Sequence, residues 1–328
     1  MIITKTPFRI SFVGGGTDLK SFYSINGGQV CNTSIDKYLY VLVRKQIGFV
    51  EYKYRINWSK IEFKNHIKDI EHPIVRETLK FFKINFPIEI GTYADIPSNT
   101  GLGSSSAFAV GLVHAISKLL NLNYSKHKIA ELASFIEIEK LKRPIGKQDH
   151  YASCFGGINI FSFNEDGKVK INKILLSKKN KLELEKGLLL LFTNIKRDAT
   201  STLKSQNKIN KKRLSYLNEI KSLVNEFSME LNKDKISIKN IGYYLNLNWI
   251  NKKKLSKKIS TPLIEKKYQE SLKIGVKGGK ILGAGNGGFL LLATTIGKKK
   301  VIDHFKLKEV KFKISNEGTK IVYESEEV

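Results

Sequence analysis

Short runs of β-branched and aromatic residues mark the first half of the chain, and segments with helical periodicity separate them. The runs predict β-strands at residues 1–13, 38–45, about 87–93 and 158–163. After Ser104–Ser106, apolar residues recur at helical spacing up to Leu120, which is typical of a buried helix face. A serine hydroxyl of this triplet is a suitable N-cap. A glycine-rich loop that opens a helix is therefore predicted here.

Two more helices are expected in this half, near 74–83 and at 125–142, the second ending at Pro144. Asp149 follows in a stretch rich in turn-forming residues. The Asp166-Gly167 pair predicts a hairpin turn before a long charged run. The first half therefore mixes strands with helices.

The second half begins with the apolar run GLLLLFTN at 187–194, which predicts a strand. Helices are expected over 199–230 and within the Lys- and Asn-rich stretch 231–275. The pattern returns to strands at 288–294, 309–315 and 319–323. We predict an α+β fold of two domains, residues 1–180 and 181–328, with the boundary in the charged run near residue 180.

Composition is that of a globular protein, with 41% hydrophobic residues in 328. No apolar run approaches the roughly 20 residues of a membrane helix, and the N-terminus lacks the pattern of a signal peptide. Cys31 and Cys154 are too few for a disulfide framework and have no metal-ligand spacing. We therefore expect a soluble, cytoplasmic protein without a membrane partner.

The net charge of +27 is high enough to suggest nucleic-acid binding. Only seven of the 57 basic residues are arginines, although Arg is favoured for bidentate base and phosphate recognition. The lysines are scattered among Ile and Asn, as expected for solvated surface positions. We expect no nucleic-acid partner, but a field that attracts anions such as ATP or a sugar phosphate.

Two glycine-rich segments could approach a ligand. PSNTGLGSSSA at 97–107 combines flexible glycines, hydroxyls and a helix N-terminus, which suits phosphate binding, although an N-capped helix after a tight turn explains it equally well. It is not a Walker loop, because no Lys-Ser or Lys-Thr pair follows its second glycine. GAGNGG at 283–288 matches a dinucleotide fingerprint in spacing, but a β-like run follows it instead of a helix. We interpret it as a turn between strands, pressed close to a ligand.

Candidate charged groups lie in two other segments. In PFRISFVGGGTD, Arg9 sits in a strand pattern and Asp18 follows three glycines. Farther along, Glu137, Glu139 and Asp149 supply carboxylates that could hold Mg²⁺ together with waters and nucleotide phosphates. Each of these carboxylates alone is more often a solvated surface charge.

In this order and spacing, the segments resemble the GHMP kinase superfamily, which contains sugar, mevalonate and homoserine kinases. The resemblance covers PFRISFVGGGTD, PSNTGLGSSSA and GKILGAGNGG and spans nearly the whole chain. It implies a ribosomal-protein-S5-like N-terminal domain and a ferredoxin-like C-terminal domain. GGGTD, GKQDHYAS and TNIKRDATSTL look most like the D-glycero-D-manno-heptose 7-phosphate kinases, which phosphorylate the C1 hydroxyl toward nucleotide-activated heptose for capsule and other surface polysaccharides.

The resemblance implies ATP and Mg²⁺ as cofactors and a sugar phosphate, heptose 7-phosphate, as acceptor. Asp149 takes the catalytic position, with Arg9 as the basic residue beside it. Ser105 and Glu139 are the implied Mg²⁺ ligands, and Glu137 stays open because the spacing from Glu139 to Asp149 differs by one residue from mevalonate kinases. The implied ATP residues are Pro97, Gly101, Leu102, Gly103, Ser104, Ser105 and Ser106.

Contacts with the acceptor are expected from three segments, residues 15–18, 196–201 and 283–286. Lys196 and Arg197 end an apolar strand just before a hydroxyl-rich helix, which favours binding of a phosphate on the acceptor, although solvated cations beside a capped helix are the alternative. The full expected set is Gly15, Gly16, Thr17, Asp18, Lys196, Arg197, Ser201, Gly283, Gly285 and Asn286.

Other functions stay open. The acceptor could be a fucose-type sugar or a mevalonate-like alcohol, whereas galactose is disfavoured because Gly15 and Gly16 stand where galactokinases carry Glu and His. Outside the enzymes, the chain could be a ligand-sensing regulator that has lost catalysis. The retained residues Arg9, Asp149, Ser105 and Glu139 argue against this. A homodimer is an open alternative, since the sequence does not determine the oligomeric state.

Overall fold

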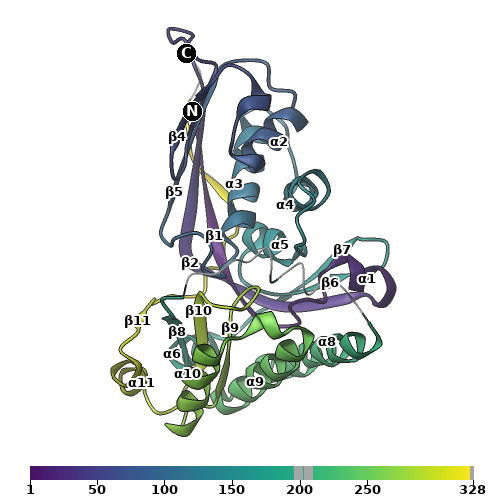
Figure 1. The fold of residues 1–328 in the computed structure, drawn as a ribbon, viewed down its shortest axis with the longest axis vertical. Helices are drawn as coiled ribbons and strands as arrows, with labels where there is room; N and C mark the ends of the chain where they lie inside the picture. The colour runs from purple at the N-terminus through teal and green to yellow at the C-terminus, as the bar shows by residue number, and fades with distance from the viewer. Residues whose placement is uncertain (196–201, 203–209, 326–328) are drawn as a thin grey trace.

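The computed structural model describes residues 1–195, 202 and 210–325. Within these ranges the chain forms two sheets with helices packed against them, which confirms the predicted α+β class (Figure 1). The larger sheet has the order β12-β1-β2-β5-β3-β4, with β6 paired to β2 and β7 paired to β6. Its strands are β1 (Ile2–Val13), β2 (Gly28–Lys45), β3 (Tyr54–Asn57), β4 (Ile61–Lys64), β5 (Ile88–Ala94), β6 (Ile158–Phe163), β7 (Val169–Ile174) and β12 (Lys320–Glu324).

The smaller sheet is antiparallel, with the order β11-β8-β10-β9. Its strands are β8 (Leu188–Phe192), β9 (Gly278–Ile281), β10 (Phe289–Ala293) and β11 (Lys308–Glu309). β8 and β10 are almost wholly apolar and buried, so the sheet is covered on both faces.

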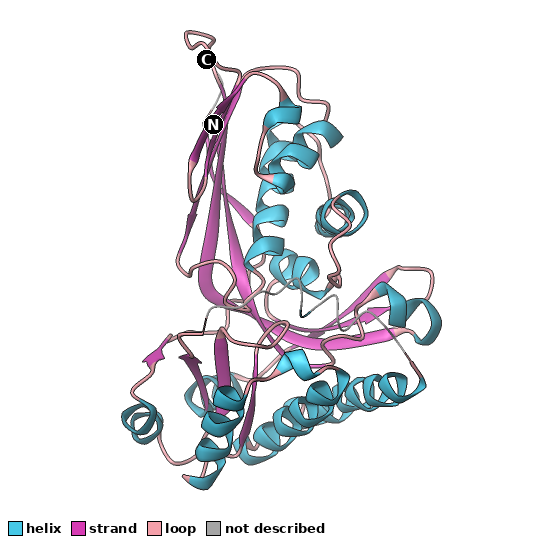
Figure 2. Ribbon diagram, viewed as in Figure 1, coloured by secondary structure: helices cyan, strands magenta, loops and turns pink. Residues whose placement is uncertain are grey.

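Helices cover one face of the larger sheet and flank the smaller one (Figure 2). The helices before the smaller sheet are α1 (Lys20–Asn26), η1 (Ile67–Asp69), α2 (Pro73–Phe81), α3 (Ser104–Leu119), α4 (Lys126–Phe135), the π-helix η2 (Ile136–Lys140), α5 (Gln148–Phe155) and α6 (Lys178–Gly187). Those that follow β8 are α8 (Lys211–Leu231), α9 (Ile238–Leu255), η3 (Lys257–Ile259), α10 (Pro262–Lys273) and α11 (Lys298–Phe305). None of the described helices has both the length and the apolar character needed to cross a bilayer.

The core joins the two halves. α3 packs against β1 and β2 so closely that a side chain at Gly111 would meet the hydroxyls of Thr4 and Thr6. From the second half of the chain, α8 contacts β1 and β2, and α9 contacts β1 and the smaller sheet. Phe12 of β1 lies 5.3 Å from Phe227 of α8, measured between ring centroids. β1 is therefore buried between helices from both halves of the chain.

Most predicted elements are confirmed, and β2 is longer than expected. The pattern indicated only 38–45, but β2 begins at Gly28, because its polar first part pairs with β6 while its apolar second part pairs with β5. Asp149, expected in a turn, lies in the first turn of α5. The part of the expected helix 199–230 that precedes residue 210 lies outside the described residues, apart from residue 202.

The strand expected at 309–315 is wrong. Only Lys308–Glu309 forms β11, because the chain then crosses between the sheets. The Val310 amide donates to Leu190 of the smaller sheet, whereas Ile314 bridges to Ile35 of the larger one. β12 then returns to the edge of the larger sheet, beside β1. The division at residue 180 stays a proposal, and the two sheets do not separate at a single point in the chain.

Candidate active site

A cleft where the two sheets approach each other collects most of the expected site residues. From the first half, Arg9, Gly16, Asp18, Asp149 and the loop Gly101–Ser106 contribute to its lining. Lys252, Lys280 and Gly283 close it from the second half. Segments more than 200 residues apart in sequence therefore meet in one hollow.

Arg9 and Asp149, which both line this cleft, form a partly buried ion pair. Nε and Nη2 of Arg9 donate to the two carboxylate oxygens of Asp149 at 2.7 and 2.6 Å, which is bidentate geometry. The remaining Nη1 donates to the Gly101 carbonyl at 2.6 Å. The Arg9 side chain is 3% exposed, whereas that of Asp149 is 23% exposed. The carboxylate is thus oriented rigidly but stays accessible from the cleft.

The glycine-serine loop leads into α3 without a side-chain cap. Gly103 is the N-cap, in the left-handed conformation with φ of 79°, and no side chain bonds to the first amides of the helix. The cap that the sequence predicted from Ser104–Ser106 is therefore wrong. A side chain at Gly103 would lie 3.3 Å from an Asp149 oxygen, so glycine keeps this approach clear. The uncapped amides and the helix dipole make an anion site beside the ion pair.

Two expected ATP residues support this loop rather than line the cleft. The Leu102 carbonyl accepts from the Arg9 amide at 3.1 Å, and the Leu102 side chain is fully buried. The Pro97 carbonyl accepts from Thr100 Oγ1 at 3.0 Å. Both contacts fix the loop conformation.

Asp18 ties the first glycine turn to α5. One oxygen accepts from the Gly16 amide at 3.0 Å and from Gln148 Nε2 at 3.1 Å, and the other accepts from the Gln148 amide at 3.2 Å. A side chain at Gly146 would collide with the Asp18 carboxylate. Burial raises the pKa of Asp18, and the charge of Asp149 raises it further. Thr17 is buried, and its hydroxyl lies within hydrogen-bond distance of the Gly14 and Gln29 carbonyls, which share its one donor, so it holds the turn.

The exposed Ser105 meets the buried Glu137 in a polar cluster. Ser105 Oγ donates to Glu137 Oε1, and Nη1 of Arg143 donates to that oxygen at 2.5 Å and to Ser105 Oγ at 2.6 Å. His150 Nε2 lies 2.8 Å from the second Glu137 oxygen. Burial alone would raise the pKa of Glu137, but the hydrogen bond and charge of His150 and the charge of Arg143 hold it at about 2. The carboxylate is therefore ionised.

Glu139 lies elsewhere. Its carboxylate pairs with Lys20 at 2.9 Å and with Lys142 at 3.7 Å, in a separate depression beside the β6–β7 hairpin. The π-helix η2 carries both glutamates, and its wider turn inserts one residue relative to an α-helix. The structure thus brings Glu137, and not Glu139, to Ser105.

The glycine-rich loop at 283–288 is a turn between β9 and β10, as predicted. It packs against the glycine-serine loop at 97–107. A side chain at Gly288 would collide with the Thr100 carbonyl. Gly283 lines the cleft, but Gly285 and Asn286 pack against Ile259, whose carbonyl accepts from the Asn286 amide at 2.7 Å. Lys196, Arg197 and Ser201 lie outside the described residues.

Several lining residues were not singled out from the sequence. Ser11, Gln148 and Lys280 occur inside the quoted motifs, which is a signal that could have identified them. Lys252 lies in a lysine-rich helix and has no such signal. Beside the cleft, a second hollow shares Asn99, Ser104 and Ser105 with it and is walled by aromatic and apolar side chains. Its aromatic lining is Trp58, His72, Tyr93 and Phe108.

Comparison with known proteins matches the description "GHMP kinases N terminal domain" to residues 67–157. A D-glycero-alpha-D-manno-heptose 7-phosphate kinase of Campylobacter jejuni is 31% identical over 319 residues, covering 91% of each chain. A mevalonate kinase of Saccharolobus solfataricus is 25% identical and covers 86% of this chain and 85% of that protein.

Solved structures share the fold over the full length. The chain superposes on a D-glycero-D-manno-heptose 1-phosphate kinase from Bacteroides thetaiotaomicron with a TM-score of 0.80, 21% identity, and coverage of 99% of this chain and 100% of that one. A phosphomevalonate kinase from Streptococcus pneumoniae gives a TM-score of 0.74 at 17% identity, covering 98% of this chain and 100% of that one. The two-domain fold expected from the sequence motifs is thereby confirmed.

Proposed function

Because this chain belongs to the GHMP kinase superfamily, we propose that it transfers the γ-phosphoryl group of ATP to the C1 hydroxyl of D-glycero-D-manno-heptose 7-phosphate. The observation that carries the proposal is the Arg9–Asp149 pair, held in one cleft with the uncapped N-terminus of α3. The identity with a heptose 7-phosphate kinase supports this acceptor class over a mevalonate-like alcohol.

The cleft supplies what phosphoryl transfer needs, which is mainly positioning and charge stabilisation. Asp149 accepts the proton of the attacking hydroxyl, since it is more exposed than Asp18, the other carboxylate that lines the cleft. Arg9 orients that carboxylate through two hydrogen bonds and places a positive charge beside the transferring group. No strongly nucleophilic protein side chain is required.

The two adjoining hollows at the glycine-serine loop (residues 97–107) offer one continuous binding site for the nucleotide. The amides at the start of α3 bind its phosphates, because they have no side-chain cap. The neighbouring hollow with Trp58, Tyr93 and Phe108 shares Ser104 and Ser105 with the cleft and suits the adenine base and ribose. ATP would therefore span both hollows, with its γ-phosphate toward Asp149.

The superfamily also implies Mg²⁺, and the donor atoms near Ser105 fit that ion. The Ser105 hydroxyl and the ionised Glu137 carboxylate are hard oxygen ligands, as Mg²⁺ prefers. Arg143 Nη1 donates to both oxygens, so Ser105 and Glu137 would hold the ion in place of this guanidinium contact. When bound, Mg²⁺ neutralises charge on the nucleotide phosphates. We assign its carboxylate ligand to Glu137.

A coupled assay of ADP release, run over a panel of free and phosphorylated sugars, tests the function. We expect turnover to be highest with heptose 7-phosphate, and phosphorus NMR of the product should show a new phosphate at C1. Turnover with mevalonate or fucose but not with heptose 7-phosphate would refute the acceptor assignment. ATP binding without turnover on any acceptor would favour the regulator instead.

A further inference from the structure

Arg143 follows the π-helix η2 and lies in a turn that folds back over the glutamate buried by that helix. The Arg143 amide donates to the Glu137 carbonyl at 3.0 Å. Lys142, the residue before it, adopts the left-handed conformation with φ of 52°. This conformation is uncommon for a residue other than glycine and persists where the surrounding contacts hold it. The turn therefore fixes Arg143 beside Glu137 through the backbone, independently of its side chain.

The Arg143 side chain lies where the structure offers a site to a cation. Nη1 is 2.5 Å from Glu137 Oε1 and 2.6 Å from Ser105 Oγ, the two oxygens assigned above to Mg²⁺. A guanidinium nitrogen and a divalent ion do not share two oxygens at such distances, because like charges this close repel each other strongly. Glu137 is fully buried, and a buried carboxylate needs a compensating positive charge. The guanidinium supplies that charge in this arrangement.

The same side chain reaches the hollow proposed for the nucleotide. Arg143 lines this hollow beside Ser104 and Ser105, and 31% of its side chain is exposed. The two serines begin α3, whose first amides have no side-chain cap and are the proposed phosphate site. A nucleotide bound there would bring several negative charges close to Arg143. Arginine is well suited to such a ligand, because its guanidinium forms charge-assisted hydrogen bonds with phosphate oxygens.

We propose that Arg143 is a nucleotide-binding residue that alternates between two anions. Its guanidinium binds the Glu137 carboxylate when no divalent ion is bound, and a phosphate group of ATP when the ion takes the Ser105–Glu137 site. Binding of the ion and of the nucleotide then favour each other, and by linkage this coupling is reciprocal. The inference rests on the proposed function for the ion and nucleotide sites, and it adds to them a residue outside the three glycine-rich motifs.

The first test measures binding of a divalent ion without nucleotide. Electron paramagnetic resonance titration with Mn²⁺ would compare Arg143→Gln with the wild-type chain. We expect Arg143→Gln to bind Mn²⁺ at least tenfold more tightly, because the ion no longer replaces a charge-assisted hydrogen bond. Lys142→Gln is the matched control, since Lys142 is the preceding cation in the same turn, is 78% exposed and pairs with Glu139 instead. This control should bind Mn²⁺ as the wild-type chain does.

The second test measures binding of a non-hydrolysable ATP analogue in EDTA. Calorimetric titration would compare Glu137→Gln with the double variant Glu137→Gln/Arg143→Gln. A neutral amide at position 137 binds the guanidinium less strongly than a carboxylate, so Arg143 is available to the phosphates in the single variant. We expect the double variant to bind the analogue at least tenfold more weakly than the single variant. Adenosine, which has no phosphate, should bind both variants equally.

An unchanged Mn²⁺ affinity in a folded Arg143→Gln would overturn the inference, because the guanidinium would then not compete with the ion. Equal affinity of the two Glu137→Gln variants for the analogue would also overturn it. Circular dichroism checks the fold. If Arg143→Gln alone does not fold, the double variant still decides the question, because it leaves no charged carboxylate at position 137. Neither test uses an acceptor, so a chain that meets both expectations but phosphorylates no sugar keeps this inference and refutes the proposed kinase activity.

Discussion

At the scale of single residues, Asp149 is the carboxylate whose surroundings combine a fixed orientation with access from the cleft. Arg9 fixes the orientation of this carboxylate through two hydrogen bonds. Because Gly103 has no side chain, the carboxylate stays accessible. Ser105, in the glycine-serine loop, and Glu137 form a second polar contact. The charges of Asp149 and Glu137 can each be removed with a near-isosteric amide, so the two roles can be tested separately.

Asp149→Asn should lower kcat by about 10²–10⁴-fold, because an amide cannot accept the hydroxyl proton. The amide oxygen still accepts one bond from Arg9, and Arg9 keeps the Gly101 carbonyl, so the fold should persist. Steady-state kinetics and circular dichroism measure the two effects. Asp166→Asn, an acid-to-amide change in the exposed hairpin turn, is the control. Wild-type kcat in Asp149→Asn would remove this residue from the role of base.

Glu137→Gln should weaken binding of a divalent ion at least tenfold, whereas Glu139→Gln should leave it unchanged, because only Glu137 contacts Ser105. Electron paramagnetic resonance titration with Mn²⁺ in the presence of a non-hydrolysable ATP analogue reports this without turnover. The two variants are matched, since both lie in η2 and both remove one carboxylate charge. The reverse order of effects would assign the ion to Glu139.

At the scale of elements, η2 and α2 show how helix ends build the site. The π-helix directs Glu137 inward and Glu139 outward, although they are two residues apart. α2 begins beside the proposed nucleotide hollow, and His72 is its N-cap, since Nδ1 accepts from the Val75 amide at 3.3 Å. This bond requires a neutral ring.

The cap should make stability depend on pH. Burial, followed by the charge of Arg143, lowers the pKa of His72 from 6.5 to about 4. The unfolded chain therefore takes up a proton at higher pH than the folded chain, and the free energy of unfolding falls as pH decreases from about 6.5 to about 4. The loss for this group is up to about 3 kcal/mol. Urea denaturation at several pH values measures it.

His72→Asn is the diagnostic variant, because Asn caps helices well and does not titrate in this range. This variant should keep most of the free energy of unfolding at pH 7. It should also reduce the acid slope, which is the fall in that free energy as the pH decreases from about 6.5 to about 4. His114, whose pKa is also lowered to about 4, contributes in the same window, so His72→Asn should remove only part of the slope. An acid slope identical to that of the wild-type chain would contradict this explanation.

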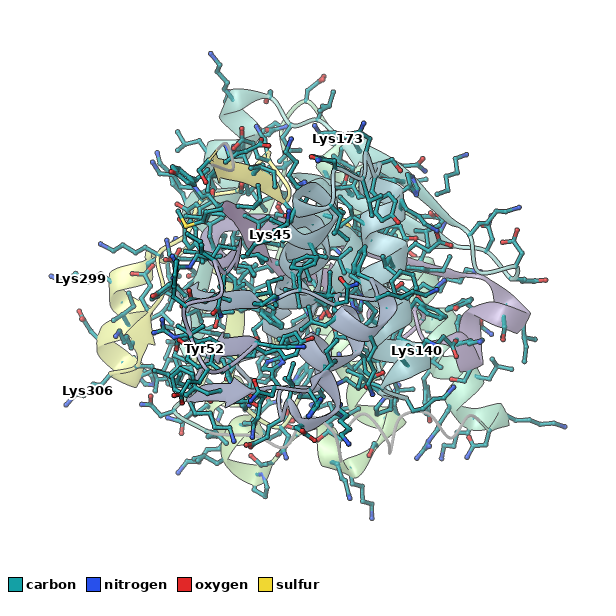
Figure 3. The ribbon with its side chains drawn as sticks, turned by 90° about the horizontal axis from the view of Figure 1, so that it is seen from above. Lys45, Tyr52, Lys140, Lys173, Lys299 and Lys306 are labelled. Atoms are coloured by element: carbon teal, nitrogen blue, oxygen red, sulfur yellow. The ribbon has the colours of Figure 1, made fainter. Side chains whose placement is uncertain are left out.

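At the scale of the whole molecule, the end of the chain returns to the sheet that begins it. β12 pairs with β1, and Thr319 contacts the Thr6 and His114 side chains and donates its amide to Ser153 of α5. β1 carries Arg9, and α5 carries Asp149. Lys299 of α11 and Lys306, which follows it, project outward at one side of the molecule, and Lys45, Lys140 and Lys173 lie on other elements (Figure 3).

A chain that ends at Gly318 should lose about 3 kcal/mol of unfolding free energy, because several hydrogen bonds to β1 and α5 disappear. Chemical denaturation measures this loss. A chain that ends at Ser325 keeps β12 and its contacts, and serves as the control. Equal stability of the two truncated chains would show that β12 contributes little to the larger sheet.

Local sequence patterns were enough to predict most of the elements and three of the loops that surround the cleft. Periodicity and glycine placement are local properties, so β1, α3 and the turn at 283–288 could be predicted from them. Tertiary structure alone decided which carboxylate meets Ser105, since the one-residue insertion of η2 reverses the directions of Glu137 and Glu139. It also decided that Lys252 and Lys280, among so many solvated lysines, are buried. Burial depends on packing between segments distant in sequence, and the spacing of residues along the chain does not record it.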